Sequence, residues 1–279
     1  MNSPRVRIDL SLDPFVAVGL IIDFLAGHFA KKGFADAVLG VSGGVDSAVG
    51  AVLAVEALGA SHVKGLAMPA GSSDPASLRD AETVASAFGF ELLLRPVGPV
   101  VDAFFDGSAN VDRMRIGNAA ARARMMRLFD YSYEHHALVI GTSNKTELLL
   151  GYGTWYGDLA CSINPIGDLY KTQIWQLADF LGVPATVIHK APSADLWPGQ
   201  TDEGELGFAY EDVDQLLYLM IDGEYSFEAL VDHGFSPEFI RKVVGRITSS
   251  QFKRSLPTIA KVSAKTVGID FHLSRDWGT

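Results

Sequence analysis

The stretch 38–49, Val-Leu-Gly-Val-Ser-Gly-Gly-Val-Asp-Ser-Ala-Val, constrains the fold more than any other part of the chain. Residues 38–41 are apolar and predict a short buried strand, residues 42–46 predict a turn, and residues 47–58 predict a helix. Where a strand leads through a glycine-rich turn into a helix, free backbone N–H groups and the positive end of the helix dipole converge. The stretch therefore predicts an anion-binding turn at the end of the first strand.

Two interpretations of this turn are open on its residues alone. The hydroxyls of Ser42 and Ser47 would add donors to a phosphate site, and the glycines would let a ligand approach the backbone. The same glycines would also suit an ordinary strand–helix turn that packs closely. The turn is not a Walker A loop, because no Gly-Lys-Ser/Thr sequence follows the glycines.

The composition is that of a globular chain with a sizeable core. Of its 279 residues, 48% are hydrophobic and 20% are charged. The length allows one large α/β domain or two small ones. Because the sequence shows no repeat, low-complexity tract or linker, we expect a single domain over residues 1–279.

The charge, the apolar runs and the cysteine count of the chain argue against several classes of protein. A net charge of −10 argues against broad nucleic-acid binding, which depends on neutralising many phosphates. No unbroken apolar run reaches the roughly 18 residues of a membrane span, and residues 1–5 lack the apolar core of a signal peptide. A single cysteine, Cys161, excludes an intramolecular disulfide and fits a reducing cytoplasm.

Strand and helix patterns alternate through the first two thirds of the chain. Strands are predicted at 38–41, 62–69, 90–95 and 137–141, and helices at 13–32, 47–58, 75–88, 96–105, 111–134 and 171–181. A terminal helical cluster is predicted at 210–221, 226–232 and 236–249. This order predicts an α/β fold with one open, mainly parallel sheet, helices on both faces and a C-terminal helical cluster.

Polar residues gather where the predicted strands end. Residues 142–147 follow the fourth strand, and ligands of open α/β sheets bind at the carboxyl ends of strands, so we expect this turn near the first one. Residues 151–170 and 190–207 are long connections rich in glycine and proline, and loops this long in compact domains are usually functional. The second of them is a candidate lid.

The first turn resembles the pyrophosphate loop of the ATP pyrophosphatases, and four stretches together resemble the NAD synthetases. They are residues 42–47 (SGGVDS), 140–147 (IGTSNKTE), 163–173 (INPIGDLYKTQ) and 192–207 (PSADLWPGQTDE, then Glu205-Leu206-Gly207). Residues 267–271 with Arg275-Asp276-Trp277 also look like the tail of that family. Other ATP pyrophosphatases, such as GMP synthetase and asparagine synthetase, share the first stretch and lack the later ones.

The resemblance implies a two-step ligation. The nicotinate carboxylate of deamido-NAD attacks the α-phosphate of ATP to give an acyl-adenylate, and ammonia then displaces AMP to give NAD. It also implies Mg²⁺, a cytoplasmic location and a homodimer. The predicted helix 111–134 offers a long face for a twofold contact and carries five arginines, whose other interpretation is a solvated basic face.

The resemblance also assigns roles residue by residue. The ATP-binding residues are Gly40, Val41, Ser42, Gly43, Gly44, Val45, Asp46, Ser47, Met68, Thr142, Lys171 and Ser193. The catalytic residues are Asp46, Glu147 and Lys171, with Asp46 and Glu147 as oxygen ligands for Mg²⁺. The residues for the dinucleotide substrate are Arg122, Trp155, Asp158, Ser162, Phe252 and Lys253.

Each assignment has an ordinary alternative. Asp46 would also suit a helix N-terminus, where the dipole favours a carboxylate. Glu147 and Lys171 alone would be read as surface residues, and Met68 as a core residue. Thr142 and Ser193 would serve as local caps. The arginines near Arg122 are expected to be surface or interface charges.

Three departures from the family pattern all fall in the dinucleotide site. Trp155-Tyr156-Gly157-Asp158 stands where the ammonia-using family commonly has Lys-Tyr-Gly-Asp. Ser162 replaces an expected aspartate, and Phe252-Lys253 replaces a His-Lys pair. We therefore expect ordinary ATP activation with altered recognition of the pyridine end, either of deamido-NAD or of a related carboxylate such as nicotinate mononucleotide.

Other classes are less consistent with the sequence. Glutamine-dependent relatives carry an amidase domain for which the chain has no room, and no matching base or acid accompanies Cys161 as a nucleophile. A non-catalytic adenine-nucleotide-binding module would not need Asp46, Glu147 and Lys171 together. An RNA-thiolating relative would need a basic face or reactive cysteines.

Overall fold

A four-stranded, all-parallel sheet organises the fold. The computed structural model describes residues 7–71, 73–108, 110–197 and 199–271. The strands β1 (Asp36–Gly40), β2 (Val63–Ala67), β3 (Glu91–Leu94) and β4 (Ala137–Val139) lie in the order β3-β2-β1-β4. In the register of the central strand, Val38 pairs with Lys64 on one side and Val139 on the other. The predicted parallel sheet is confirmed.

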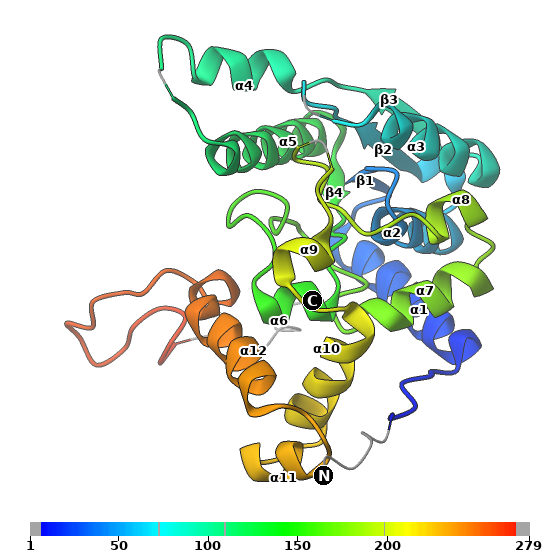
Figure 1. The fold of residues 1–279 in the computed structure, drawn as a ribbon. Helices are drawn as coiled ribbons and strands as arrows, with labels where there is room; N and C mark the ends of the chain where they lie inside the picture. Colours follow the sequence, from blue (N-terminus) through cyan, green and yellow to red (C-terminus); the bar gives the residue numbers. More distant parts are fainter. Residues whose placement is uncertain (1–6, 72, 109, 198, 272–279) are drawn as a thin grey trace.

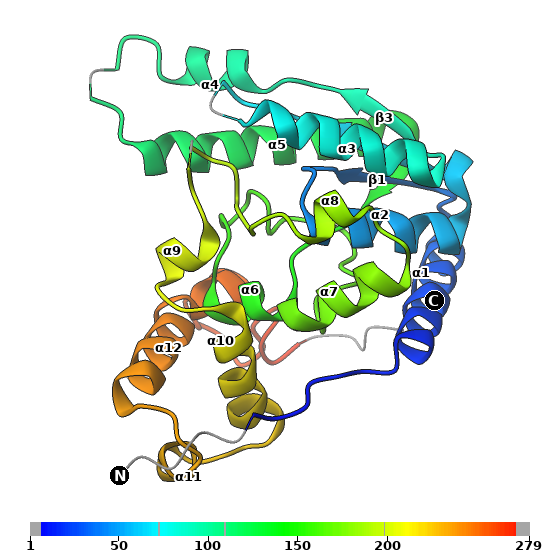
Figure 2. The same cartoon turned by 45° about the vertical axis from the view of Figure 1, so that its right-hand side comes forward.

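Helices cover both faces of the sheet (Figures 1 and 2). One face is packed by α1 (Pro14–Lys32), α2 (Val45–Leu58), α3 (Pro75–Phe88), α7 (Lys171–Phe180) and α8 (Ala185–Ile188). The other face is packed by α4 (Gly98–Phe104) and α5 (Arg113–His135). The predicted two-sided α/β arrangement is therefore confirmed.

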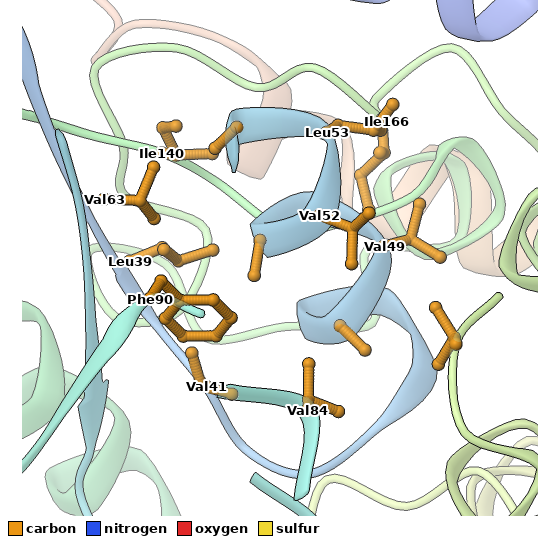
Figure 3. Close-up of a cluster of buried hydrophobic side chains, with 14 of the residues drawn as sticks. Leu39, Val41, Val49, Val52, Leu53, Val63, Val84, Phe90, Ile140 and Ile166 are labelled. Carbon is orange, nitrogen blue, oxygen red and sulfur yellow. The ribbon is translucent and has the colours of Figure 1, made fainter. Parts of the chain in front are cut away.

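The helix α2 lies at the centre of the larger core (Figure 3). Its Val49, Val52 and Leu53 are buried, together with Leu39 of β1 and Phe90 beside β3. Because α2 is covered by the sheet, α1, α3 and α7, apolar residues surround it on nearly every side. This explains its composition of valine, alanine and glycine.

The remaining helices pack around a second hydrophobic core. They are α6 (Lys145–Leu150), α9 (Asp202–Leu206), α10 (Tyr210–Leu217), the π-helical turn η2 (Tyr218–Asp222), α11 (Phe227–Asp232) and α12 (Pro237–Ser249). Two short 3₁₀ turns, η1 (Ala60–His62) and η3 (Gln251–Arg254), complete the elements. The C-terminal helical cluster is thus present as predicted.

Helix-capping signals in the sequence agree with the structure, whereas short helices were not predicted. Asp74 caps α3 by accepting a hydrogen bond of 2.8 Å from the Ala76 amide, with Pro75 at the first helical position as predicted. The helices α6, α8 and α9 were not predicted; they have only four to six residues and lie within or beside connections that the sequence pattern marks as turns and loops. The predicted loop 190–207 is wrong over its last part, where α9 forms. Pro198 of that loop, Ala109 and the tail residues 275–277 lie outside the described residues.

The helix α1 qualifies the sequence-based statement on membrane spans. Within the described ranges, α1 is the one helix that is long enough and apolar enough to cross a membrane, by length and composition only. Its mean hydropathy over an 18-residue window is 1.4. The sequence analysis predicts this helix but does not identify it as a possible membrane span, because polar residues interrupt its apolar run. In this structure its Val18, Leu25 and Phe29 are buried in the larger core.

The strand order creates a switch point between β1 and β4. From β1 the chain proceeds to β2 and β3 on one side, and it returns to β4 on the other. Loops that leave the carboxyl ends of β1 and β4 therefore diverge and leave a crevice between them, the usual ligand position in such sheets. The two predicted turns, 42–46 and 142–147, follow these two strands.

Candidate active site

The turn after β1 is closed by its own serines. The Ser42 amide donates to Ser47 Oγ over 3.1 Å, and Ser47 Oγ donates to the Gly44 carbonyl over 2.9 Å. Gly43 has φ +78°, and a Cβ there would lie 2.2 Å from the Ser77 carbonyl oxygen on α3, so the position requires glycine. Gly44 caps α2 with no side-chain hydrogen bond, which leaves the first amides of the helix for another acceptor. The helix begins at Val45, two residues earlier than predicted.

The turn after β4 is fixed to α2. Asn144 and Glu147 form a capping box on α6, with the Glu147 amide donating to Asn144 Oδ1 over 2.9 Å. Asn144 Nδ2 also donates to Asp46 Oδ1 over 2.8 Å. Thr142 lies against α2, since a Cβ on Gly50 would be 3.2 Å from its methyl carbon. The predicted proximity of the two turns is therefore observed.

A buried lysine lies between the two candidate metal ligands. Lys171, the first residue of α7, is 2% exposed, and its Nζ forms an ion pair with Asp46 Oδ2. The same Nζ lies 3.9 Å from Glu147 Oε1. Burial opposes the charge of the ammonium, but the carboxylates of Asp46 and Glu147 raise the pKa of Lys171 above its ordinary value. The structure therefore brings together the three residues that the sequence proposes as catalytic.

The surroundings of Glu147 disfavour the charged form of its carboxyl. Burial raises the pKa of its carboxyl well above the ordinary glutamate value, the Asp46 charge raises it further, and Lys171 opposes both. The carboxylates of Asp46 and Glu147 are hard oxygen donors of the kind that suits a magnesium ion. The described residues contain no group of three or more His, Cys, Asp or Glu side chains placed to hold a metal, so phosphate or water oxygens would complete the coordination.

A carboxylate that sequence reasoning missed supports this cluster. Asp214, on α10, is fully buried and accepts from Thr146 Oγ1 over 2.6 Å and from the Thr172 amide over 2.8 Å. Thr146 Oγ1 in turn accepts from the Lys171 amide over 3.0 Å. Asp214 thereby fixes the start of α7 against α6. It lies in an amphipathic stretch with no recognisable motif, so the sequence carried no signal for it.

Met68 marks the other flank of the β1 turn. It is buried, and its methyl carbon would lie 3.3 Å from a Cβ on Gly40. Its carbonyl accepts a hydrogen bond of 3.0 Å from Nε of Arg124 on α5. Burial lowers the pKa of Arg124 below its ordinary value. Arg124 therefore faces inward because of its phase on the helix, so the expectation of a surface charge is wrong for it, whereas the alternative expectation of an interface charge stays a prediction.

The predicted dinucleotide residues form an aromatic group. The Trp155 ring stacks on Tyr156 with centroids 4.3 Å apart, and Phe252 meets it edge-on at 5.3 Å. Arg122 Nη2 donates to the Trp155 carbonyl over 3.4 Å. Tyr156 has φ +57°, an uncommon backbone conformation for a bulky residue. Arg122, Trp155 and Phe252 are therefore neighbours.

The other predicted dinucleotide residues make separate contacts. Lys253 Nζ donates to the carbonyls of Gly151 and Gly153, each over 2.7 Å, so its ammonium is used within the chain. Asp158 Oδ1 accepts from the Thr154 amide over 2.8 Å. Ser162 is exposed, and its amide donates to the Val139 carbonyl over 2.9 Å.

The described residues 190–197 and 199–201, which we call the crossing segment, pass over this edge of the sheet. Figures 1 and 2 show the chain rising from α8 toward α5 and returning to α9. Lys190 Nζ pairs with Asp80 of α3 over 2.7 Å, and Arg113 of α5 lies 4.8 Å from the Trp197 ring. Ser193 Oγ accepts from the Asp195 amide over 3.1 Å within the segment. In the described part of the chain, Ser193 makes no hydrogen bond to Asp46, Glu147 or Lys171.

Fold and site together define a class. The protein has the features of an α/β nucleotide-binding protein. Its parallel sheet carries a glycine-rich turn, a helix N-terminus and a buried lysine with its carboxylate partners at the switch point. The family model described as NAD synthase matches residues 17–257. The chain belongs to the NAD synthase family, as its motifs predicted.

Individual relatives agree with this assignment. An NH(3)-dependent NAD(+) synthetase from Trichlorobacter lovleyi is 52% identical over 259 residues, which cover 93% of this chain and 95% of that one. A protein of the same name from Chlorobaculum parvum is 49% identical over 96% of this chain and 97% of its own.

Solved structures give the same fold. An NH3-dependent NAD synthetase from Campylobacter jejuni has a TM-score of 0.77 and 36% identity, covering 90% of this chain and 100% of that one. An NMN synthetase from Francisella tularensis has a TM-score of 0.78 and 32% identity, covering 90% and 99%.

Proposed function

We propose that the protein is an ammonia-dependent NAD synthetase that amidates deamido-NAD at the expense of ATP. A carboxylate oxygen of the nicotinate attacks the α-phosphorus, and the bond from that phosphorus to the bridging oxygen breaks, releasing pyrophosphate. Ammonia then attacks the acyl carbon, the bond to the AMP oxygen breaks, and one proton is released to solvent. The products are NAD, AMP and pyrophosphate.

The geometry suits this chemistry because it offers charge neutralisation and positioning. A carboxylate needs little base catalysis to attack phosphorus, so the enzyme mainly holds phosphate charge and aligns the reacting groups. The amides at the start of α2 and the hydroxyls of Ser42 and Ser47 would bind the pyrophosphate part of ATP. Thr142 and the backbone near Met68 lie beside this turn and would meet the rest of the nucleotide, with Ser193 reaching it from the crossing segment.

Lys171 would hold phosphate charge, and Asp46 and Glu147 would hold Mg²⁺. A buried ammonium contacted by two carboxylates has a fixed position, which is what a group aimed at a leaving phosphate needs. Mg²⁺, when bound, would supply further positive charge to the phosphate oxygens. The gathering of the two part-buried carboxylates around the buried Lys171 is the observation that carries the proposal, and a module that merely bound nucleotide would not need it.

The aromatic group supports a second candidate substrate. Trp155, Tyr156 and Phe252 offer flat surfaces for a pyridine ring but no cation for a distant phosphate. Nicotinate mononucleotide, which lacks the adenylate half of deamido-NAD, would satisfy such a site, and a protein similar to this chain in structure is named an NMN synthetase. Deamido-NAD is the first candidate because the relatives at 49–52% identity are NAD synthetases.

The assembly and location belong to the same proposal. We place the chain in the cytoplasm as a homodimer of single-domain subunits. Exposed apolar residues along α5 support a twofold contact: Met114, Met126, Phe129 and Tyr133 are 51%, 52%, 37% and 94% exposed. Sedimentation at assay concentration should give a dimer, and a fully active monomer would refute this part.

An isotope experiment tests the proposed reaction. Deamido-NAD labelled with ¹⁸O in its carboxylate is incubated with ATP, Mg²⁺ and ammonium, and the products are separated by mass. Attack on the α-phosphorus followed by amidation must leave one labelled oxygen in AMP and none in pyrophosphate. NAD formed without label in AMP would rule out an acyl-adenylate.

A further inference from the structure

A buried carboxylate fastens the base of the crossing segment. Asp202, the first residue of α9, is 4% exposed and accepts from the hydroxyls of Tyr152 over 2.9 Å and Tyr210 over 3.0 Å. Its Oδ1 also accepts from the Ala194 amide over 3.1 Å, and its own amide donates to the Pro192 carbonyl over 2.9 Å. Asp202 therefore holds the chain on both sides of Ser193, the residue between Pro192 and Ala194.

The Tyr152 hydroxyl joins this carboxylate to a second one. It lies 2.7 Å from Glu205 Oε2 as well as 2.9 Å from Asp202 Oδ1. Gln200 extends the network, with its Nε2 donating to Glu205 Oε2 and its Oε1 accepting from the Leu196 amide, each over 2.8 Å. One hydroxyl proton thus lies between two carboxylates. Without the hydroxyl, the two negative groups would face each other with no donor between them.

The same network rests on the catalytic elements. The Tyr152 amide donates to the Glu147 carbonyl over 2.9 Å, and the Tyr210 ring lies 5.3 Å from Lys171 Nζ. Burial and the two carboxylates raise the pKa of Tyr152 far above its ordinary value, so its hydroxyl stays protonated and donates. The tip of the segment makes exposed contacts instead, such as that of Asp195 with the Asp74 amide at 3.0 Å.

We propose that Tyr152 and Asp202 are positioning residues that hold the crossing segment over the active site, so that Ser193 meets the nucleotide and water is kept from the acyl-adenylate. This inference rests on the proposed function. Where water reaches the intermediate, it attacks the acyl carbon and breaks the bond to the AMP oxygen. That reaction returns deamido-NAD and releases AMP, so ATP is consumed with no NAD formed.

The test compares Tyr152→Phe with Tyr218→Phe, a control tyrosine on η2 outside this network. Each protein is incubated with ATP, Mg²⁺, ammonium and deamido-NAD, and AMP and NAD are counted. The wild type and Tyr218→Phe should give one AMP per NAD, whereas Tyr152→Phe should give several AMP per NAD. Asp202→Asn, which keeps the side-chain shape, should raise the same ratio and serves where Tyr152→Phe does not fold.

A second measurement separates this inference from the proposed function. Limited proteolysis between residues 190 and 201 should be several-fold faster in Tyr152→Phe than in the control, with ATP present in both. A ratio that stays at one while AMP and NAD fall together would mean a merely structural role and would overturn the inference, as would equal proteolysis. A wild type that forms no NAD would instead overturn the proposed function, and the proteolysis would still decide whether the network holds the segment.

Discussion

The two sides of the site differ in how they are built. The phosphate side, formed by the β1 turn with Asp46, Glu147 and Lys171, is organised around the buried Lys171 and is densely hydrogen-bonded. The pyridine side, formed by Arg122, Trp155, Ser162, Phe252 and Lys253, is aromatic and partly exposed, with Phe252 51% exposed. The phosphate side agrees with the family motif throughout, and every departure from the motif falls on the pyridine side.

The difference follows from what each side must do. Binding phosphate and metal requires charges at fixed places, and a buried charge is tolerated only when its partners are also fixed. Binding a flat ring requires apolar area, which different aromatic side chains can supply. We therefore expect substitutions on the phosphate side to abolish the chemistry, and substitutions on the pyridine side to change the substrate affinity.

The largest effect is expected from Asp46→Asn. Loss of this charge removes a proposed Mg²⁺ ligand and the partner of Lys171, and kcat/KM should fall by about 10²–10³-fold, as when one preorganised electrostatic group is removed. Asparagine is preferred to alanine because it keeps the side-chain shape and an oxygen that accepts from Lys171, which limits the loss of about 3–5 kcal/mol that breaking a buried ion pair costs. Asp23→Asn, an exposed acid on α1, is the control. Retention of activity within a few-fold, with thermal unfolding unchanged, would remove the metal assignment.

On the pyridine side, Trp155→Lys should change affinity for the substrate. Tryptophan cannot form the charge-assisted contact of a lysine, which is worth about 1.5–3 kcal/mol, or roughly tenfold or more in affinity. We expect the KM for deamido-NAD to fall by about tenfold and the KM for ATP to stay the same. Trp155→Phe, which keeps an aromatic ring, is the matched control. If the wild type already binds deamido-NAD tightly and the lysine weakens it, the tryptophan is itself a determinant of binding.

The crossing segment should link the two sides through ATP. We expect protease cleavage within residues 197–203 to slow several-fold when ATP and Mg²⁺ are present, because the segment must close to exclude water from the intermediate. The assay follows fragments over time with and without nucleotide. Equal cleavage in both conditions would count against a lid.

The smallest effect is expected at Cys161. Burial raises the pKa of its thiol above the ordinary value, so less thiolate is present near neutral pH. Alkylation should therefore be slow and should accelerate as the pH rises beyond the ordinary thiol range. Cys161→Ser should keep ammonia-dependent activity within about twofold, since a similar-sized substitution at a residue that takes no part in the reaction costs little stability. Loss of activity in that variant would assign the thiol a role in the reaction.

Sequence reasoning succeeded where the signal is local. The β1–turn–α2 unit is predicted to within two residues, because apolar runs, glycines and helix composition all lie within one stretch. The capping of α3 by Asp74 was predictable for the same reason. The family motifs identified Asp46, Glu147 and Lys171 as site residues. Without those motifs, Glu147 and Lys171 would have been assigned to the surface.

It failed where the determinant is a distant partner. Asp214 meets Thr146, 68 residues earlier in the chain, and nothing near Asp214 announces this contact. The inward direction of Arg124 depends on which face of α5 meets the sheet. Lys253 stays a predicted substrate residue, but nothing in the sequence indicated that its ammonium binds carbonyls about 100 residues away. Such pairings appear only once the chain is folded.

One measurement tests the central claim that this site adenylates the carboxylate of deamido-NAD with ATP and then amidates it. With saturating ATP, Mg²⁺ and ammonium, kcat/KM is determined for deamido-NAD and for nicotinate mononucleotide, and AMP and amide product are quantified for each. Our account predicts one AMP per amide formed and a higher kcat/KM for deamido-NAD. Amide formed from nicotinate mononucleotide alone, or no AMP-linked amide from either carboxylate, would contradict it.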